Sequence, residues 1–268
     1  MAGPFLLLEQ PTDWSIDIDP AVRFIRFNRP EKKNALTQEM GVHFKNAISE
    51  LKQDSNCRVV VLTGEGDCFS AGGDFKFLEQ RCNDTADNNQ AVMKSFYDSF
   101  LCLRTLNVPV IAAVQGHAIG AGLALALSSD LRLVSQDAKL GLTFVRLGLH
   151  PGMGSTFFTP RALGQQRAWW ALLTGNRFSG TEAVQWGMFL QALAPDQVVP
   201  AAIALANDIA HLSPNAVQTT LKTLRDQEGP LLEATLWKEA LGQSLCYGHS
   251  DMNEGLAAIQ EKRKPRFP

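Results

Sequence analysis

Two glycine-rich turns stand out because they expose the backbone to a ligand. The first, residues 68–76, reads Cys-Phe-Ser-Ala-Gly-Gly-Asp-Phe-Lys, and the second, residues 115–123, reads Gln-Gly-His-Ala-Ile-Gly-Ala-Gly-Leu. Residues without bulky side chains let a ligand approach backbone N–H groups closely. Two N–H groups that converge can stabilise negative charge as it develops on an oxygen atom. We therefore expect an oxyanion site built from main-chain donors.

Each turn follows a segment that has the composition of a buried strand. Residues 58–63 and 109–114 each contain an apolar run without polar alternation, which is typical of strands covered on both faces of a parallel sheet. Ligands of open α/β sheets bind at the carboxyl ends of such strands. The second turn also opens a helix expected over residues 121–129, whose N-terminus favours negative charge. The glycines of either turn alone could simply allow a tight turn of the backbone. Two such turns on neighbouring strands indicate an oxyanion site.

The rest of the chain predicts the elements that hold these turns. Strands are also expected at 22–28 and 131–135, and helices at 38–53, with Thr37 as N-cap, and at 91–106 after a polar linker at 83–90. Beyond Gly152 the strand signals fade, and residues 155–262 indicate helices separated by glycine and proline. The sequence therefore predicts an α/β core with a helical C-terminal part.

Composition excludes several partners. The 268 residues include 25 basic and 27 acidic ones, so no global positive field attracts nucleic acid or anionic lipid. Residues 105–129 carry no formal charge, but Pro109, Gln115 and several glycines interrupt them, so a strand and a helix fit better than a membrane span.

The cysteines and the N-terminus bear on location. Five cysteines show no metal-binding spacing, so we expect free thiols, no metal site and a reducing compartment. The N-terminal residues lack the basic start and long apolar run of a secretory signal. The expected location is cytoplasmic.

From about Arg23 to Phe267 the chain resembles the crotonase, or enoyl-CoA hydratase/isomerase, superfamily. The motifs that carry the resemblance are Asn-Arg-Pro at 28–30, Asn-Ala-Leu at 34–36, Phe-Ser-Ala-Gly-Gly-Asp at 69–74, residues 109–116 leading to Gly-Ala-Gly at 120–122, Leu-Gly at 147–148, Pro-Gly-Met-Gly at 151–154, and Glu-Gly at 254–255 leading to residues 261–265. The resemblance implies an α/β, crotonase-like ββα superhelix. The resemblance also implies that the chain divides into a core over residues 1–205 and a helical C-terminal trimerisation region over residues 206–268.

The resemblance also implies the partners and the binding residues. The substrate is an acyl-CoA thioester, coenzyme A is part of that substrate rather than a separate cofactor, and the chain forms a homotrimer or a hexamer. The oxyanion donors are the N–H groups of Gly73 and Ala121. The other substrate-binding positions implied are Ala71, Gly120, Ala124 and Phe144, with Lys32, Lys33 and Lys76 on the coenzyme phosphates and Lys262 or Lys264 reaching from the tail of an adjacent subunit.

The sequence departs from the hydratases of the superfamily at the acid and base positions. The two glutamates of those enzymes are replaced by Ala124 and Phe144, and Gly152 stands where some relatives carry an aspartate. General acids and bases contribute roughly 10²–10⁴-fold each, so efficient hydration of 2-enoyl-CoA is not expected. Decarboxylation, isomerisation or carbon–carbon cleavage through an enolate remain open. His150 is the candidate that could replace a glutamate, while His117 is expected to touch the site through its backbone only.

Two other classes of protein are weighed against this interpretation. A non-catalytic, acyl-CoA-binding homologue would explain the missing glutamates. A dinucleotide-dependent oxidoreductase is disfavoured, because Leu125 stands where the third glycine of its fingerprint belongs. The acyl group is expected to contact residues 77–100. Apolar residues of the tail are expected to pack on a neighbouring subunit: Trp237, Leu241, Leu245 and Leu256.

Overall fold

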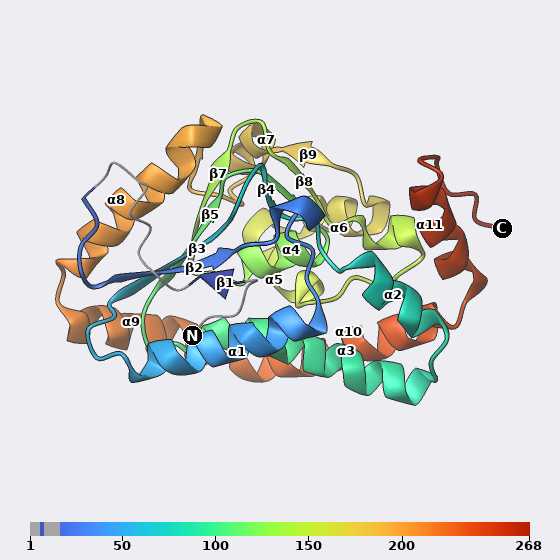
Figure 1. The fold of residues 1–268 in the computed structure, drawn as a ribbon, viewed down its shortest axis with the longest axis horizontal. Helices are drawn as coiled ribbons and strands as arrows, with labels where there is room; N and C mark the ends of the chain where they lie inside the picture. The colour runs from blue at the N-terminus through green and yellow to red at the C-terminus, as the bar shows by residue number, and fades with distance from the viewer. Residues whose placement is uncertain (1–5, 8–16) are drawn as a thin grey trace.

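The computed structural model describes residues 6–7 and 17–268, which form two β-sheets surrounded by helices (Figure 1). Most of the N-terminal segment that we interpreted as lacking a secretory signal lies outside the described residues. The larger sheet contains, in spatial order, β1 (Leu6–Leu7), β2 (Val22–Phe27), β3 (Val59–Gly64), β5 (Val110–Val114), β7 (Leu131–Ser135) and β10 (Gln191–Leu193). All neighbouring strands except the β1 and β2 pair run parallel.

The smaller sheet explains how the two glycine turns are held. It contains, in spatial order, β4 (Cys68–Ser70), β6 (His117–Ile119), β8 (Lys139–Gly141) and β9 (Phe178–Ser179). Each turn thus includes a short strand: β3 leads through β4 to α2 (Phe75–Cys82), and β5 leads through β6 to α4 (Ala121–Leu127). This repeated strand–strand–helix unit is the ββα pattern expected for the crotonase fold.

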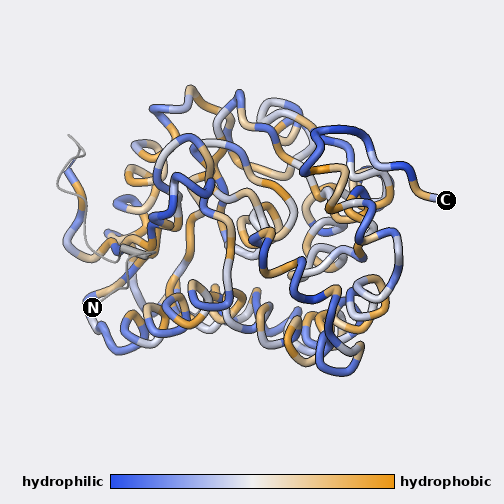
Figure 2. The backbone as a smooth tube through the Cα atoms, turned by 45° about the vertical axis from the view of Figure 1, so that its right-hand side comes forward, coloured by the Kyte–Doolittle hydropathy of each residue, from blue (hydrophilic) through white to orange (hydrophobic). Residues whose placement is uncertain are grey.

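Three long helices lie side by side below the sheets: α1 (Gln38–Gln53), α3 (Ala86–Leu101) and α10 (Gly229–Tyr247) (Figure 1). The prediction for α1 is confirmed, since Thr37 Oγ1 accepts a hydrogen bond from Met40 N–H at 3.1 Å. The predicted polar linker at 83–90 is wrong. Helix α3 begins at Ala86 because Thr85 caps it, accepting from Asn88 N–H at 3.3 Å. The helical parts of the tube carry both hydrophilic and hydrophobic stretches (Figure 2).

The large sheet separates two hydrophobic cores. Alternate residues of β2 and β3, including Phe24 and Val61, pack against α8 (Val198–Ala210), while Ile25 and Leu62 face the larger core on the other side. This burial of both faces accounts for the apolar runs in β3 and β5. The remaining helices are α5 (Ser155–Leu163), α6 (Gln165–Thr174), α7 (Gly180–Gln185), α9 (Pro214–Asp226) and α11 (Ser250–Gln260).

The C-terminal part differs in detail from the sequence prediction. Strands β9 and β10 lie beyond Gly152, where we expected helices alone; at two and three residues they are too short to show a period. The domain boundary expected at residue 205 falls inside α8 and stays a prediction. All five cysteines are free. Among the described helices, none combines the length and apolar character that crossing a bilayer requires.

Candidate active site

The first glycine turn leaves the backbone N–H of Gly73 without an acceptor among the described residues. Leu36 N–H donates to Gly72 O at 2.7 Å, and Asp74 N–H donates to Leu36 O at 2.9 Å. Between these bonds, the N–H of Gly73 has no hydrogen-bond acceptor within the described part of the chain. Asp74 holds the turn in place, because it caps α2 through Lys76 N–H and pairs with Arg29 at 3.0 Å.

A buried asparagine fixes the same turn from below. Asn34 is fully buried, and its Nδ2 donates to Cys68 O at 2.7 Å and to Glu65 O at 2.9 Å. Ser70 Oγ donates in turn to Asn34 O at 2.8 Å. These bonds account for the Asn-Ala-Leu motif, which anchors the loop rather than touching a ligand.

The second turn lies directly against the first. Gly72 has a φ of +93°, and a Cβ atom there would lie 2.7 Å from Ile119 O and 3.4 Å from Ala121 N. A Cβ atom at Gly122 would lie 2.5 Å from Ser70 O. Because real Cβ atoms do not approach this closely, glycine at both positions allows α4 to pack on the first turn. Ala121 is the first residue of α4, so its N–H has no acceptor inside the helix.

Both free N–H groups belong to residues that line one cavity of about 490 Å³. Six residues predicted to form the site line it: Lys33, Ala71, Gly73, Gly120, Ala121 and Phe144. Phe144 lies beside the second turn, since a Cβ atom at Gly120 would be 3.9 Å from its Cζ. The structure therefore brings the two predicted turns and Phe144 together around one space.

Four other predicted residues do not line this cavity. Ala124 is fully buried in α4, and Lys32 and Lys76 are exposed on the surface. His150 turns toward α10, with its Nδ1 2.6 Å from Pro151 O and its ring against Gly242. Their roles in binding or catalysis stay predictions.

Basic groups are present in the cavity wall, but among the described residues no aspartate or glutamate lines it. The basic residues are Lys33, His117, Lys139 and Arg177. His117 Nδ1 accepts a hydrogen bond from Lys139 N–H at 3.0 Å. Burial and the positive charge of Lys139 lower the pKa of His117, so its imidazole is neutral at neutral pH. His117 lines the cavity, and the expectation that it touches the site through its backbone only stays a prediction.

A buried polar pair lies within the otherwise apolar part of the wall. Tyr97 Oη donates to Gln243 Oε1 at 2.7 Å, and Gln243 Nε2 donates to His150 O at 2.8 Å. Burial, followed by the nearby charge of Glu239, raises the pKa of Tyr97 well above its usual value, so the phenol stays protonated. A Cβ atom at Gly152 would overlap Tyr97 Oη and lie 2.7 Å from Gln243 Nε2. No aspartate fits at that position without moving this pair.

The apolar wall comes partly from the segment that the sequence indicated. Within residues 77–100, the residues that line the cavity are Phe77, Leu78, Met93, Phe96 and Tyr97. The rings of Phe77 and Phe96 stack at 4.9 Å. Phe100 instead packs against Phe44, with ring centroids 5.5 Å apart, and is absent from the wall.

Several wall residues come from distant elements and were not predicted from the sequence. These are Lys139 and Arg177 from the small sheet and its neighbouring loop, Gln243 and Tyr247 from α10, and Leu256 and Ile259 from α11. No motif marks them, because only the path of the C-terminal helices brings them to the cavity. A smaller adjoining cavity contains Arg146, Arg177, Arg263 and Lys264 of the same chain. Lys264, expected to reach into a neighbouring subunit, thus lies beside this chain's own cavity.

Comparisons with known proteins agree with this arrangement. The family model described as enoyl-CoA hydratase/isomerase matches residues 17–268. A putative enoyl-CoA hydratase of Thermus thermophilus is 35% identical over 246 residues, which cover 92% of this chain and 97% of that protein. The probable enoyl-CoA hydratase EchA14 of Mycobacterium tuberculosis is 37% identical over 215 residues, covering 80% of this chain and 82% of that protein.

Solved structures show the same architecture. Pseudomonas aeruginosa OdaA superposes with a TM-score of 0.82 and 31% identity, covering 95% of this chain and 98% of that chain. A structure from work on a dehydratase/decarboxylase enzyme couple involved in polyketide β-branching superposes with a TM-score of 0.82 and 26% identity, covering 94% of this chain and 98% of that chain.

Proposed function

We propose, since the chain belongs to the enoyl-CoA hydratase/isomerase family, that it acts on an acyl-CoA thioester through an enolate bound by two backbone N–H groups. The observation that carries the proposal is the contact between the two glycine turns, which brings Gly73 and Ala121 to one cavity. Both N–H groups lack acceptors within the described residues and are free to bind a thioester oxygen. Their hydrogen bonds strengthen as that oxygen gains negative charge.

The wall of the cavity favours a reaction that needs no carboxylate base. Hydration of a conjugated double bond requires a group that activates water and a group that protonates the α-carbon. The described wall holds no aspartate or glutamate for either step. We therefore favour decarboxylation of a malonyl-type thioester, with isomerisation or another carbon–carbon cleavage as the alternatives within the same chemistry.

In the decarboxylation, the bond between the α-carbon and the carboxylate breaks and carbon dioxide leaves. The electron pair of that bond moves into the thioester and forms the enolate, whose oxygen accepts hydrogen bonds from Gly73 and Ala121. The α-carbon then takes a proton from water. An apolar wall assists the first step, because it solvates the substrate carboxylate poorly. Phe144, which replaces a glutamate of the hydratases, contributes to that apolar wall.

The charges near the cavity suggest how the coenzyme lies. Lys33, Lys139 and Arg177 provide cations in the wall, and Lys32 and Lys76 are exposed on the surface. The phosphates of coenzyme A bind among these groups in our proposal, while the acyl group faces the apolar end with Tyr97 and Gln243. Reversible ion pairs of this kind hold the coenzyme without taking part in the chemistry.

A non-catalytic, acyl-CoA-binding protein is the second candidate, and the same lack of wall carboxylates favours it. Incubation of the full chain with malonyl-CoA, methylmalonyl-CoA and crotonyl-CoA, followed by mass spectrometry, separates the possibilities. We expect conversion of a malonyl-type thioester to its decarboxylated product. Hydration of crotonyl-CoA alone would overturn the proposed reaction. Saturable binding of all three without conversion of any would identify the non-catalytic protein.

A further inference from the structure

A second cavity, of about 530 Å³, lies at the other edge of the large sheet. The candidate active site is at the ends of β3 and β5, whereas this cavity includes Asp130 and Arg132 at the start of β7. Asp130 Oδ2 also accepts Val110 N–H, at the start of β5, at 2.8 Å. Because β3, β5 and β7 run parallel, the two cavities occupy opposite edges of the sheet. This second cavity is separate from the proposed acyl-CoA site.

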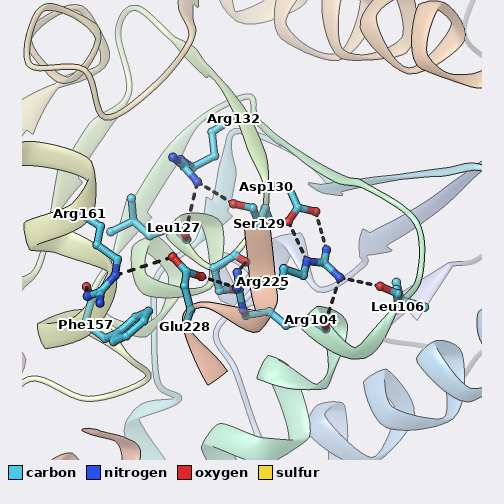
Figure 3. Close-up of polar contacts among 11 residues, drawn as sticks. Arg104, Leu106, Leu127, Ser129, Asp130, Arg132, Phe157, Arg161, Arg225 and Glu228 are labelled. Atoms are coloured by element: carbon cyan, nitrogen blue, oxygen red, sulfur yellow. Dashed lines mark hydrogen bonds and ion pairs between the residues drawn. The ribbon is translucent and has the colours of Figure 1, made fainter. Parts of the chain in front are cut away.

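The wall of the second cavity is strongly basic. Four arginines and two carboxylates line it, so four positive charges less two negative charges leave a formal charge of +2: Arg104, Arg132, Arg161, Arg225, Asp130 and Glu228 (Figure 3). Two of the arginines are neutralised by close ion pairs. Arg225 binds Asp130 through two hydrogen bonds of 2.9 and 2.5 Å, and Arg104 binds Glu228 at 2.5 Å.

Arg132 and Arg161 carry the remaining positive charge. Arg132 donates to the carbonyl oxygens of Ser129 at 2.6 Å, Met188 at 3.0 Å and Leu127 at 3.3 Å. Within the described chain no carboxylate forms an ion pair with Arg132, and its Nη2 has no acceptor. Arg161 stacks on Phe157, with Cζ 3.5 Å from the ring centroid, and its Nε is 3.7 Å from Glu228.

A buried hydroxyl adds a further unused donor. Ser129 is 2% exposed and lines the cavity, and its Oγ has no hydrogen-bond partner in the structure. Buried hydroxyl groups are nearly always hydrogen-bonded in folded proteins, so an unpartnered one calls for an explanation. A partly buried guanidinium that forms no ion pair with a described carboxylate calls for one too, since desolvating a charge is costly unless it is paired. A bound anion satisfies both groups.

We propose that this cavity binds the phosphate group of a small organic molecule. Guanidinium groups match the oxygens of phosphate in geometry and charge, and a phosphate dianion balances the formal charge of +2. The rest of the ligand contacts the apolar part of the wall, which consists of Leu127, Phe158, Ala162, Leu221 and Leu224. Arg132 and Ser129 bind the phosphate oxygens, and the more exposed Arg161 covers the solvent side of the bound phosphate.

Calorimetric titration of the full chain with inorganic phosphate, at constant ionic strength set with potassium chloride, tests the proposal. We expect saturable binding that Arg132→Gln weakens roughly tenfold or more, as loss of a charge-assisted hydrogen bond implies. The matched control is Arg58→Gln, which removes the same charge from an arginine that also donates to a backbone carbonyl, Ala210 O at 2.9 Å, but lies outside this cavity. The control should bind phosphate like the unmodified chain.

Ser129→Ala tests the same site in case the Arg132→Gln variant does not fold. This substitution removes a hydroxyl that makes no hydrogen bond in the structure, so the folded chain loses no hydrogen bond. We expect severalfold weaker phosphate binding. Absence of binding, or equal binding by the Arg132→Gln and Arg58→Gln variants, would each overturn the proposal.

Discussion

Ala121 allows a backbone hydrogen-bond donor to be removed without disturbing the helix that carries it. Proline is well tolerated at the first position of a helix, where its missing N–H has no intrahelical role. The preceding residue, Gly120, has a φ of +53° and a ψ of −122°, outside the α-helical region that a following proline disfavours. The contribution of one proposed oxyanion donor is therefore open to direct measurement.

We predict that Ala121→Pro lowers kcat by about 10²–10³-fold, the usual cost of removing one oxyanion-hole donor. Steady-state kinetics on whichever thioester the chain converts provide the measurement, with circular dichroism to verify the fold. Ala121→Gly is the matched control, because it keeps the N–H and should retain most of the activity. Equal activity of the proline and glycine variants would exclude this N–H from catalysis.

Carboxylates introduced at both predicted acid–base positions test whether the remainder of the site suits hydration. Phe144 lies beside the second turn, and Ala124, one helical turn after Gly120, is fully buried. We predict that Ala124→Glu with Phe144→Glu raises crotonyl-CoA hydration by several powers of ten, as two acid–base groups at roughly 10²–10⁴-fold each imply. Ala124→Glu alone should gain little and destabilise the chain, because its carboxylate enters a fully buried position and lacks the second acid–base group. A spectrophotometric assay that follows loss of the conjugated double bond measures both variants.

Individual site residues were predictable to the extent that they belong to local motifs. The glycine turns could be found because small residues recur at fixed places after apolar strands, and the structure brings Gly73 and Ala121 to one cavity. The pair of Tyr97 and Gln243 could not be found, because 146 residues separate its two members. Only the packing of α10 against α3 brings them together.

Helices α5 and α10 are joined by a buried glutamate, which makes their contact sensitive to pH. Glu239 of α10 is 1% exposed and accepts Gly154 N–H at 2.6 Å and Thr156 N–H at 2.7 Å, at the start of α5. Thr156 Oγ1 donates to it as well, at 2.6 Å. Burial raises the pKa of Glu239 to about 7, even though these hydrogen bonds lower it.

We predict that this contact loses stability as the pH rises. The folded chain holds the Glu239 proton more tightly than the unfolded chain, whose carboxyl has a pKa near 4.5. The contribution to the free energy of unfolding is therefore complete below pH 4.5 and falls by up to about 3 kcal/mol as the pH passes 7. Urea unfolding between pH 5 and 8 should show this fall relative to Glu239→Gln, which cannot titrate. Parallel pH profiles for the two proteins would contradict the prediction.

Helices could be predicted where the spacing of apolar residues and the identity of the N-cap residue agreed. Helix α1 shows both an apolar face and a capping threonine, and its bounds were predicted correctly. The start of α3 was missed because its first turns carry polar residues that resemble a linker. Strands β4 and β6 were missed as strands, since three residues among glycines show no alternation. Such short strands form only because neighbouring segments offer backbone partners.

The outer face of α10 bears on how whole chains associate. Trp237, Leu241 and Leu245 recur at four-residue intervals and are 48%, 47% and 65% exposed. Leu256, which we expected on the same surface, is 6% exposed and packs inside its own chain. An apolar stripe of this kind favours contact with another protein surface, and we propose that it contributes to a homotrimer or hexamer.

We predict that Leu241→Asp with Leu245→Asp shifts the chain toward the monomer, because two carboxylates would have to lose water in the interface. Light scattering coupled to size-exclusion chromatography measures the mass directly. Leu173→Asp is a suitable control, since Leu173 is 72% exposed on α6, away from α10. A monomeric parent chain, or an oligomer that withstands the double substitution, would contradict the prediction.

Helix α11 has a consequence for mixtures of active and inactive protein. Its Leu256 and Ile259 complete the cavity wall of the chain to which they belong. Helix α11 and the two glycine turns of one chain thus line the same cavity. A copy damaged in α11 and a copy damaged in a glycine turn should therefore not rescue one another when they are co-expressed, because neither chain then holds both parts of its own wall.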